Sequence, residues 1–274
     1  MVSSSLHRRA ALSVTLLALA ACDVSEEQEV ALGEQTARQI EAQLPSVEDP
    51  AVDRYINALG RSIVRVTERR DLAWRFEVVD SRSVNAFALP GGFVYVNRGL
   101  VERAENLSEL AGVLGHEIGH VTLRHSVDQM QKAQRTNVGL TLVCTLTSIC
   151  ESGAARVAIN VGGSALFARF SREDESEADS AGIDYVMRAG ISPAGVPAMF
   201  ETLLAERDRR PGVVEAWFGT HPLEERRVAE TRRLIAALDA GRVEALVVDS
   251  PEFQEFKRRV QALPPPPEPP PAQP

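Results

Sequence analysis

The sequence has no excess of basic residues and no long uninterrupted apolar run. It carries 30 lysines and arginines against 38 aspartates and glutamates, a formal net charge of −8 at pH 7. An acidic chain is poorly suited to nucleic acid or to an anionic lipid surface, so we expect neither as a charge-driven partner. The apolar segment 136–168 is interrupted by Glu151, Arg156 and several glycines, which does not support a membrane span. We interpret it as a hairpin of helices or a mobile flap near a cleft.

Cysteine is also scarce, because the chain has only three. Cys144 and Cys150 lie close together in the sequence, and they could form a small-loop disulfide in an oxidising compartment or remain two buried thiols. No histidine lies near them, so we do not expect them to bind a metal. No internal repeat of tetratricopeptide period is present either. The length of the chain is sufficient for one domain with a sizeable core.

The third cysteine, Cys22, ends an N-terminal sorting signal. Arg8 and Arg9 precede a short apolar run, and residues 19–22 (Leu-Ala-Ala-Cys) resemble a bacterial lipobox. The pattern predicts a lipoprotein signal peptide at residues 1–21 and a lipidated tether at 22–26, which would hold the chain at the periplasmic face of the inner or outer membrane. An ordinary secretory signal with an incidental cysteine is the alternative. Cleavage would remove the two arginines and change the net charge from −8 to −10.

The spacing of apolar residues predicts a mainly helical domain at 27–263 with a few short strands. Strands are expected at 74–79, 84–89 and 93–97. Helices are expected at 27–44, 51–69, 98–105, 107–132, 174–189, 193–207 and 222–240. Residues 264–274 form a proline-rich tail that cannot pack a core, and we expect it to be disordered.

Residues 116–120 read His-Glu-Ile-Gly-His within an apolar helical stretch. Histidines four residues apart leave the same face of a helix, so His116 and His120 can bind one metal ion. Glu117 projects toward the same cavity, where it can take a proton from a water molecule. A core helix with two coincidentally spaced histidines is the alternative, but histidine and glutamate are costly to bury without a partner or a metal. The spacing therefore predicts the zinc site of a peptidase.

An acidic segment at residues 171–179 offers the third protein ligand that a catalytic zinc requires. Glu175 and Asp179 share a helical face, so one carboxylate can bind the metal while the other accepts a hydrogen bond from a ligating histidine. Glu173 and Glu177 form a second pair with the same spacing on another face. Spacing alone neither chooses between the pairs nor excludes a solvated acidic helix.

These motifs together resemble the HtpX, CAAX prenyl protease and BepA/LoiP group of zinc metallopeptidases, which are gluzincins. Residues 171–179 are similar to the Ser-Arg-x-x-Glu-x-x-Ala-Asp-like segment of that group, residues 85–92 to its Asn-Ala-Phe…Pro-Gly-Gly segment, and residues 220–222 to its Thr-His-Pro segment. The resemblance implies an α+β, mainly helical zincin-like domain with a small sheet next to the active-site helix. In having no repeats, the chain resembles the short lipoprotein members of this group.

The resemblance also implies which residues hold the metal. One Zn²⁺ per chain would be bound by His116, His120 and Glu175. Asp179 would accept a hydrogen bond from one of the ligating histidines. His221 would either stabilise the oxyanion or cap the zinc as a latency switch, and a surface-loop histidine is the alternative.

Two other groups have weaker signals. Asn85, Ala86 and Phe87 could present backbone groups to an extended substrate, or they could form an ordinary core hairpin. His125 is five residues beyond His120, about 140° round a continuous helix, so we expect it to lie outside the metal site and to have a structural role.

The sequence therefore predicts a zinc metalloendopeptidase in which Glu117 acts as general base and passes the proton to the leaving amine. Its expected substrates are unfolded or misfolded proteins of the bacterial envelope, including outer-membrane proteins. The alternative is a latent, zinc-bound chaperone or assembly factor with little proteolysis. A structural lipoprotein without zinc would require both metal motifs to be coincidental.

Overall fold

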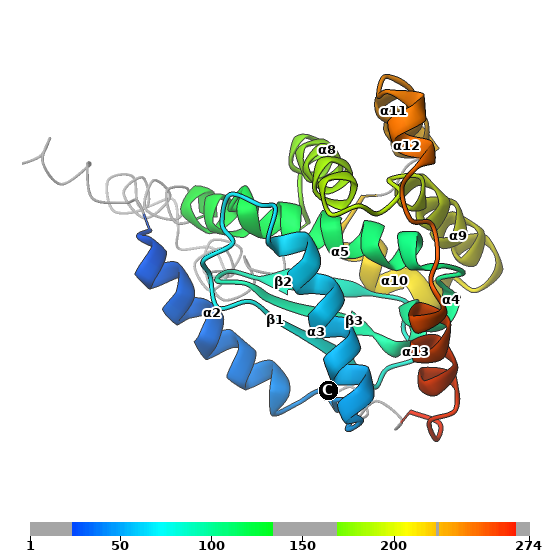
Figure 1. The fold of residues 1–274 in the computed structure, drawn as a ribbon. Coiled ribbons are helices and arrows are strands. Elements are labelled where there is room, and N and C mark those ends of the chain that lie inside the picture. Colours follow the sequence, from blue (N-terminus) through cyan, green and yellow to red (C-terminus); the bar gives the residue numbers. More distant parts are fainter. Residues whose placement is uncertain (1–23, 134–168, 223–224, 267–274) are drawn as a thin grey trace, which may run out of the picture.

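The computed structural model describes residues 24–133, 169–222 and 225–266 of the chain. Helices predominate in these ranges, and three short strands form one sheet, so the expected mainly helical α+β fold is confirmed (Figure 1). The elements are α2 (Glu26–Glu41), α3 (Pro50–Val64), β1 (Arg75–Val79), β2 (Ala86–Leu89), β3 (Phe93–Asn97), α4 (Arg98–Arg103), α5 (Leu107–Thr122), α8 (Arg172–Arg188), α9 (Gly195–Arg209), α10 (Pro211–Thr220), α11 (Glu225–Ala236), α12 (Ala240–Glu244) and α13 (Pro251–Gln261).

The sheet has the order β1-β3-β2, with β3 in the middle. β1 pairs with β3 in parallel, and β2 pairs with β3 antiparallel. The hairpin between β2 and β3 turns through Gly91 and Gly92, whose φ angles of 82° and 97° lie in the left-handed region that favours glycine. Strand β2 therefore forms one edge of the sheet.

Helix α5 occupies the centre of the molecule, between the sheet and helices α8 and α9 (Figure 1). Fifteen of its sixteen residues are buried. Glycines at its contact with α8 let the two backbones approach closely: a Cβ added to Gly182 would lie 2.9 Å from the backbone carbon of Gly115. Because a larger side chain would push the helices apart, this contact fixes how near groups on α5 can come to groups on α8.

The helix expected at 107–132 is interrupted, and this prediction was wrong in its extent. Helix α5 ends at Thr122, the chain turns at Leu123 and Arg124, and helical structure resumes at residues 125–133. Arg124 has a φ of 61°, which no helical residue adopts. Apolar periodicity continues across the turn, so periodicity alone did not reveal the break.

The C-terminal part of the chain packs against the same core. Helix α13, which the sequence reading missed, buries Phe253, Phe256 and Val260. Just before it, Asp249 Oδ1 accepts a hydrogen bond of 3.0 Å from the backbone N–H of Leu107 at the start of α5. Residues 249–260 therefore hold the N-terminal end of the central helix.

Several predictions fall outside the described residues: the signal peptide with Cys22, the segment 136–168 with Cys144 and Cys150, and most of the proline-rich tail. Within the described ranges, the helices are all too short or too polar to cross a bilayer.

Candidate metal centre

Two capped helices, α5 and α8, carry the three predicted ligands of the metal site. Asn106 caps α5 by accepting a hydrogen bond of 3.2 Å from the N–H of Glu109. Ser171 caps α8, and its hydroxyl and the Asp174 carboxylate bond reciprocally to each other's backbone N–H at 3.1 and 2.9 Å. Such caps satisfy the free donors of the first turn and define where each helix starts. The caps thereby fix where α5 and α8 begin.

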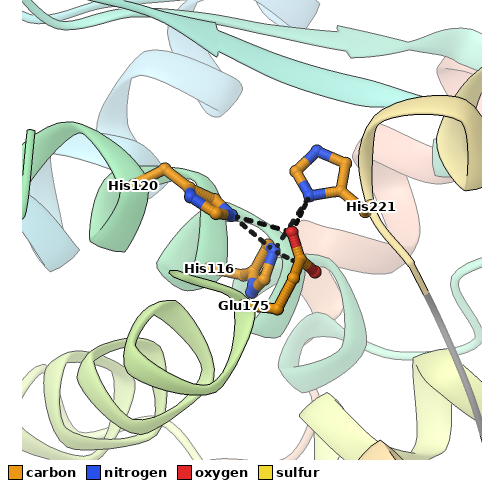
Figure 2. A group of neighbouring side chains, drawn as sticks. All are labelled: His116, His120, Glu175 and His221. Carbon is orange, nitrogen blue, oxygen red and sulfur yellow. Dashed lines mark hydrogen bonds and ion pairs between the residues drawn. The ribbon is translucent and has the colours of Figure 1, made fainter. Parts of the chain in front are cut away.

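Four side chains from three segments converge in the interior: His116, His120, Glu175 and His221 (Figure 2). Each can offer one ligand atom so that all four atoms lie within 4.8 Å of one another. The Nε2 atoms of His116 and His120 are 3.1 Å apart, and Glu175 Oε1 lies 3.4 Å from His120 Nε2. All four residues are at most 2% exposed. The structure thus brings together the three predicted ligands and His221.

The donor set and its spacing fit zinc. Zinc binds imidazole nitrogen and carboxylate oxygen, and atoms that share a tetrahedral zinc lie about 3.3–3.6 Å from one another. The two histidine Nε2 atoms lie 3.1 Å apart, and the carboxylate of Glu175 lies 3.4 Å from His120 Nε2 through Oε1 and 3.7 Å from His116 Nε2 through Oε2. Burial holds the pKa of the His120 imidazole well below its ordinary value, so the ring is neutral, as a metal ligand must be.

His221 follows the last residue of α10 and points into the cluster from the side opposite α8 (Figure 2). Its Nδ1 lies 2.9 Å from Glu175 Oε1, and its Nε2 lies 3.5 Å from Glu117 Oε1. Its ring stacks on Trp217, with 4.7 Å between centroids. The surface-loop alternative is wrong, because His221 is only 1% exposed. The same ring can reach the metal position and the expected general base.

Glu117 lies beside the cluster, and one of its oxygens, Oε1, makes no hydrogen bond. The residue is 1% exposed. Burial raises the pKa of the Glu117 carboxyl. A buried carboxylate oxygen without a hydrogen bond is costly in a purely structural role, whereas a general base needs an oxygen that can accept a proton and a raised pKa.

Arg227, which was not predicted from the sequence, joins the carboxylates of Glu175 and Asp179 on α8. Asp179 Oδ1 lies 2.9 Å from His116 Nδ1. The Arg227 guanidinium donates to both oxygens of Asp179, at 2.9 and 2.6 Å, and also to Glu175. Burial alone would raise the pKa of Asp179, but the charges and hydrogen bonds of Arg227 and His116 together outweigh it and hold the pKa below its ordinary value. Glu175 and Asp179 are therefore both ionised and fixed in place.

Comparison with known proteins assigns the chain to a family. Residues 50–235 match the model of peptidase family M48. The chain belongs to this family. The match contains every residue of the buried cluster as well as Glu117, Asp179 and Arg227.

The relatives with this domain are named proteases. The chain is 34% identical over 234 residues to the beta-barrel assembly-enhancing protease of Escherichia coli O157:H7, covering 82% of this chain and 46% of that protein. It is 37% identical over 163 residues to metalloprotease YcaL of E. coli K12 (59% of this chain, 62% of the relative) and 32% identical over 181 residues to metalloprotease LoiP of the same strain (66% and 68%). The chain thus spans about half the length of the beta-barrel assembly-enhancing protease.

Membership of family M48 confirms the expected resemblance and the class of metalloendopeptidase. The expected cofactor is also confirmed, because M48 metalloproteases use zinc and the buried cluster can hold one ion.

His125 is not among the four possible ligands, as expected, but it contacts His120, which a continuous helix would not allow. Its Nδ1 lies 2.9 Å from His120 Nδ1, and its Nε2 lies 3.2 Å from Glu177 Oε2. The expectation assumed a continuous helix, and the turn at Arg124 removes that assumption. A non-glycine residue in the left-handed region has no reliable sequence signal, so the sequence offered little warning.

The predicted substrate-binding residues lie at the start of the edge strand β2, which packs beside α5. Ala86 is fully buried, and Phe87 is half-buried and stacks on Tyr95 with 5.0 Å between centroids. The backbone carbonyl of Asn85 accepts a hydrogen bond of 2.9 Å from Asn97 N–H on β3. These residues therefore have a core role, and they also border the described edge of the sheet.

Proposed function

We propose that this chain is a zinc endopeptidase of the bacterial cell envelope that cleaves unfolded or misfolded envelope proteins, including outer-membrane proteins. The observation that carries the proposal is the buried cluster of His116, His120, Glu175 and His221 with the carboxylate of Glu117 beside it, whose Oε1 makes no hydrogen bond. A structural metal site has no use for a general base at that position.

In the proposed mechanism, His116, His120 and Glu175 hold the zinc. Zinc supplies a Lewis acid that polarises the peptide carbonyl and makes water more acidic. Glu117 accepts the proton of the attacking water and passes it to the leaving amine, and its raised pKa suits it to both transfers. Asp179 accepts the Nδ1–H of His116 and so directs Nε2 of that ring toward the cluster.

Substrate would bind in extended form along β2. In an antiparallel pair the backbone groups of alternate residues face away from the partner strand. Since Asn85 bonds to Asn97 across the pair, the outward groups belong to Ala86 and Ala88. Ala86 is fully buried and Ala88 half-buried, so a substrate can pair with them only when this edge is uncovered. A peptide that pairs with them is recognised mainly through its main chain, which suits unfolded segments of varied sequence.

The cell-envelope location rests on the sequence and on the names of the relatives. The lipobox-like residues 19–22 predict a lipid on Cys22, and several relatives are named beta-barrel assembly-enhancing proteases. We propose a domain at 27–263 that the lipid holds at the periplasmic face of a membrane. A Cys22→Ser variant should move from the membrane fraction to the soluble fraction, and an unchanged membrane fraction would reject the anchor.

The substrate class can be tested with an outer-membrane β-barrel protein offered in two forms. The chain should cleave the urea-unfolded form and leave the detergent-folded form intact, while Glu117→Gln should cleave neither. Equal cleavage of the folded barrel would contradict the proposed preference. Cleavage by Glu117→Gln would indicate a contaminating protease.

The alternative is a latent zinc-bound chaperone, and the position of His221 favours it, since Nδ1 of that ring lies within the ligand cluster. A His221→Ala variant separates the two roles. Proteolysis should increase if the ring closes the metal site, and it should fall about 10²-fold or more if the ring stabilises the oxyanion. Unchanged proteolysis would contradict both roles.

A further inference from the structure

The turn that ends α5 has an unusual residue in its left-handed position. Helices commonly end with a glycine there, because a side chain makes this conformation unfavourable. This chain has Arg124 instead, at a φ of 61°, and it is the only non-glycine residue with positive φ in the described ranges. A non-glycine residue persists in such a conformation only where its surroundings hold it.

Arg124 is held by the first helix of the described chain. Its Nε donates to Glu29 Oε2 at 2.8 Å, and its Nη2 donates to the carbonyl of Val24 at 2.7 Å. Glu29 is 1% exposed and also accepts from Arg69, at 2.7 and 3.2 Å. Arg69 in turn donates to the carbonyl of Val121 at 3.1 Å. One buried carboxylate thus connects α2, the segment after α3 and the last turn of α5.

The turn determines where His125 lies. After the turn at Leu123 and Arg124 helical structure resumes, and the His125 ring, 3% exposed, contacts His120 with 2.9 Å between the two Nδ1 atoms. Two ring nitrogens at this distance need one donor and one acceptor. If His120 uses Nε2 for the metal, its Nδ1–H donates, so His125 must accept at Nδ1 and donate from Nε2 to Glu177, 3.2 Å away. The contacts fit one consistent arrangement of protons.

We propose that His125 is a positioning residue that orients the ring of His120 toward the metal, and that Glu29, acting through Arg124, holds the turn that carries His125. The inference rests on the proposed metal-binding role of His120. It gives each histidine of the motif its own support: His116 has the carboxylate of Asp179, and His120 has a neutral imidazole. Loss of a partner that supports a ligating histidine commonly weakens metal affinity about 10- to 100-fold.

The first test compares two substitutions of His125 in the full chain. His125→Leu removes the acceptor, whereas His125→Asn keeps an oxygen close to the position of Nδ1. Zinc affinity is measured by competition with a chelating dye, and Co²⁺-loaded samples give the visible ligand-field spectrum. We expect His125→Leu to weaken zinc binding about 10- to 100-fold and to alter the Co²⁺ spectrum, and His125→Asn to recover most of both. Equal loss in the two variants, or no loss in either, would overturn the role of the acceptor.

The second test examines the contact with α2. Glu29→Gln should weaken zinc binding, whereas Glu26→Gln should not, because Glu26 also bonds to Arg69 but is exposed and does not touch Arg124. Arg124→Gly covers the case in which Glu29→Gln fails to fold, since glycine accepts the left-handed turn and removes only the side-chain contacts. We expect several-fold weaker zinc binding in Arg124→Gly. Wild-type affinity in that variant would overturn the role of Glu29.

These readouts do not depend on proteolysis. A wild-type chain that binds zinc without cleaving peptides would contradict the proposed function. The zinc affinities of the variants would still decide the present inference. A wild-type chain that binds no zinc would overturn both.

Discussion

Arg227 is the residue on which the carboxylates of Glu175 and Asp179 depend. It is 5% exposed, donates to Asp179 and Glu175, and lies over the ring of Phe200 with 4.5 Å to its centroid. A buried ion pair is a poor source of stability, but the loss of one partner leaves a buried charge uncompensated. The position of Glu175 in the cluster therefore relies on this guanidinium.

Replacement of Arg227 by methionine should destabilise the chain and weaken its zinc binding. The expected loss is about 3–5 kcal/mol of unfolding free energy, because two buried carboxylates lose their cation. Urea unfolding and dye competition measure the two effects. Arg226→Met is the matched control: Arg226 is 56% exposed in its side chain and pairs with the exposed Glu230 at 3.4 Å, so the change should be about 1 kcal/mol or less. Similar losses in both variants would contradict this role.

At the scale of single residues, the sequence predicted those site residues whose spacing indicates a shared helical face. His116, Glu117 and His120 lie four residues or fewer apart on one helix, and the resemblance to known metallopeptidases selected Glu175. Arg227 and His125 were missed for different reasons. Arg227 lies on a separate helix with no spacing that links it to the site, and His125 depends on a turn that its neighbours in the sequence do not reveal.

Between elements, the contact of α5 with α8 decides whether the ligands meet. A Cβ on Gly182 would lie 2.9 Å from the backbone nitrogen of His116 as well as from Gly115. Backbone atoms cannot yield as the end of a side chain can, so α8 would have to move away from α5. Glu175 would move with it.

Gly182→Ala should therefore lower zinc affinity as well as stability. Overpacking of this kind costs about 1–3 kcal/mol, although alanine is intrinsically the better helix former. The control is Gly212→Ala in α10, where an added Cβ has nothing within 4 Å, and this change should leave both quantities close to wild type. Thermal unfolding and zinc titration would check the pair. Wild-type zinc affinity in Gly182→Ala would show that the ligands do not require this close approach.

Element prediction located most elements but not all of their ends: the helix expected at 51–69 ends at Val64, and helix α10 was not predicted. The strands and the helix with the acidic segment lie where expected, within about two residues, the usual uncertainty of helix ends. Helix α13 was missed because its apolar residues are few and separated by charges, although Phe253, Phe256 and Val260 share the spacing of one face. The long helix predicted from residue 107 ignored a turn whose stability comes from distant contacts with α2.

For the molecule as a whole, the core extends beyond the segment that matches family M48. The match ends at residue 235, yet Phe253 is fully buried in the main core and Asp249 holds the start of α5. Residues 249–260 therefore belong to the same folding unit as the metal site.

Phe253→Ala should destabilise the whole domain by about 3–5 kcal/mol, as expected when a buried aromatic ring is replaced by a cavity. Val248→Ala, at a residue that is 51% exposed, should change stability by about 0.5 kcal/mol or less. Chemical denaturation followed by tryptophan fluorescence reports the result, since Trp217 lies in the same core cluster. A small effect of Phe253→Ala would mean that the C-terminal helix folds apart from the rest.

The central claim is that the buried cluster holds a zinc ion and that Glu117 uses it to hydrolyse peptide bonds. The most direct measurement is cleavage of unfolded casein by wild type and Glu117→Gln, with the zinc content of both samples determined. The account predicts one zinc per chain in both and a rate at least about 10²-fold lower in Glu117→Gln. Zinc in both samples with equal cleavage, or cleavage by a chain without zinc, would contradict it.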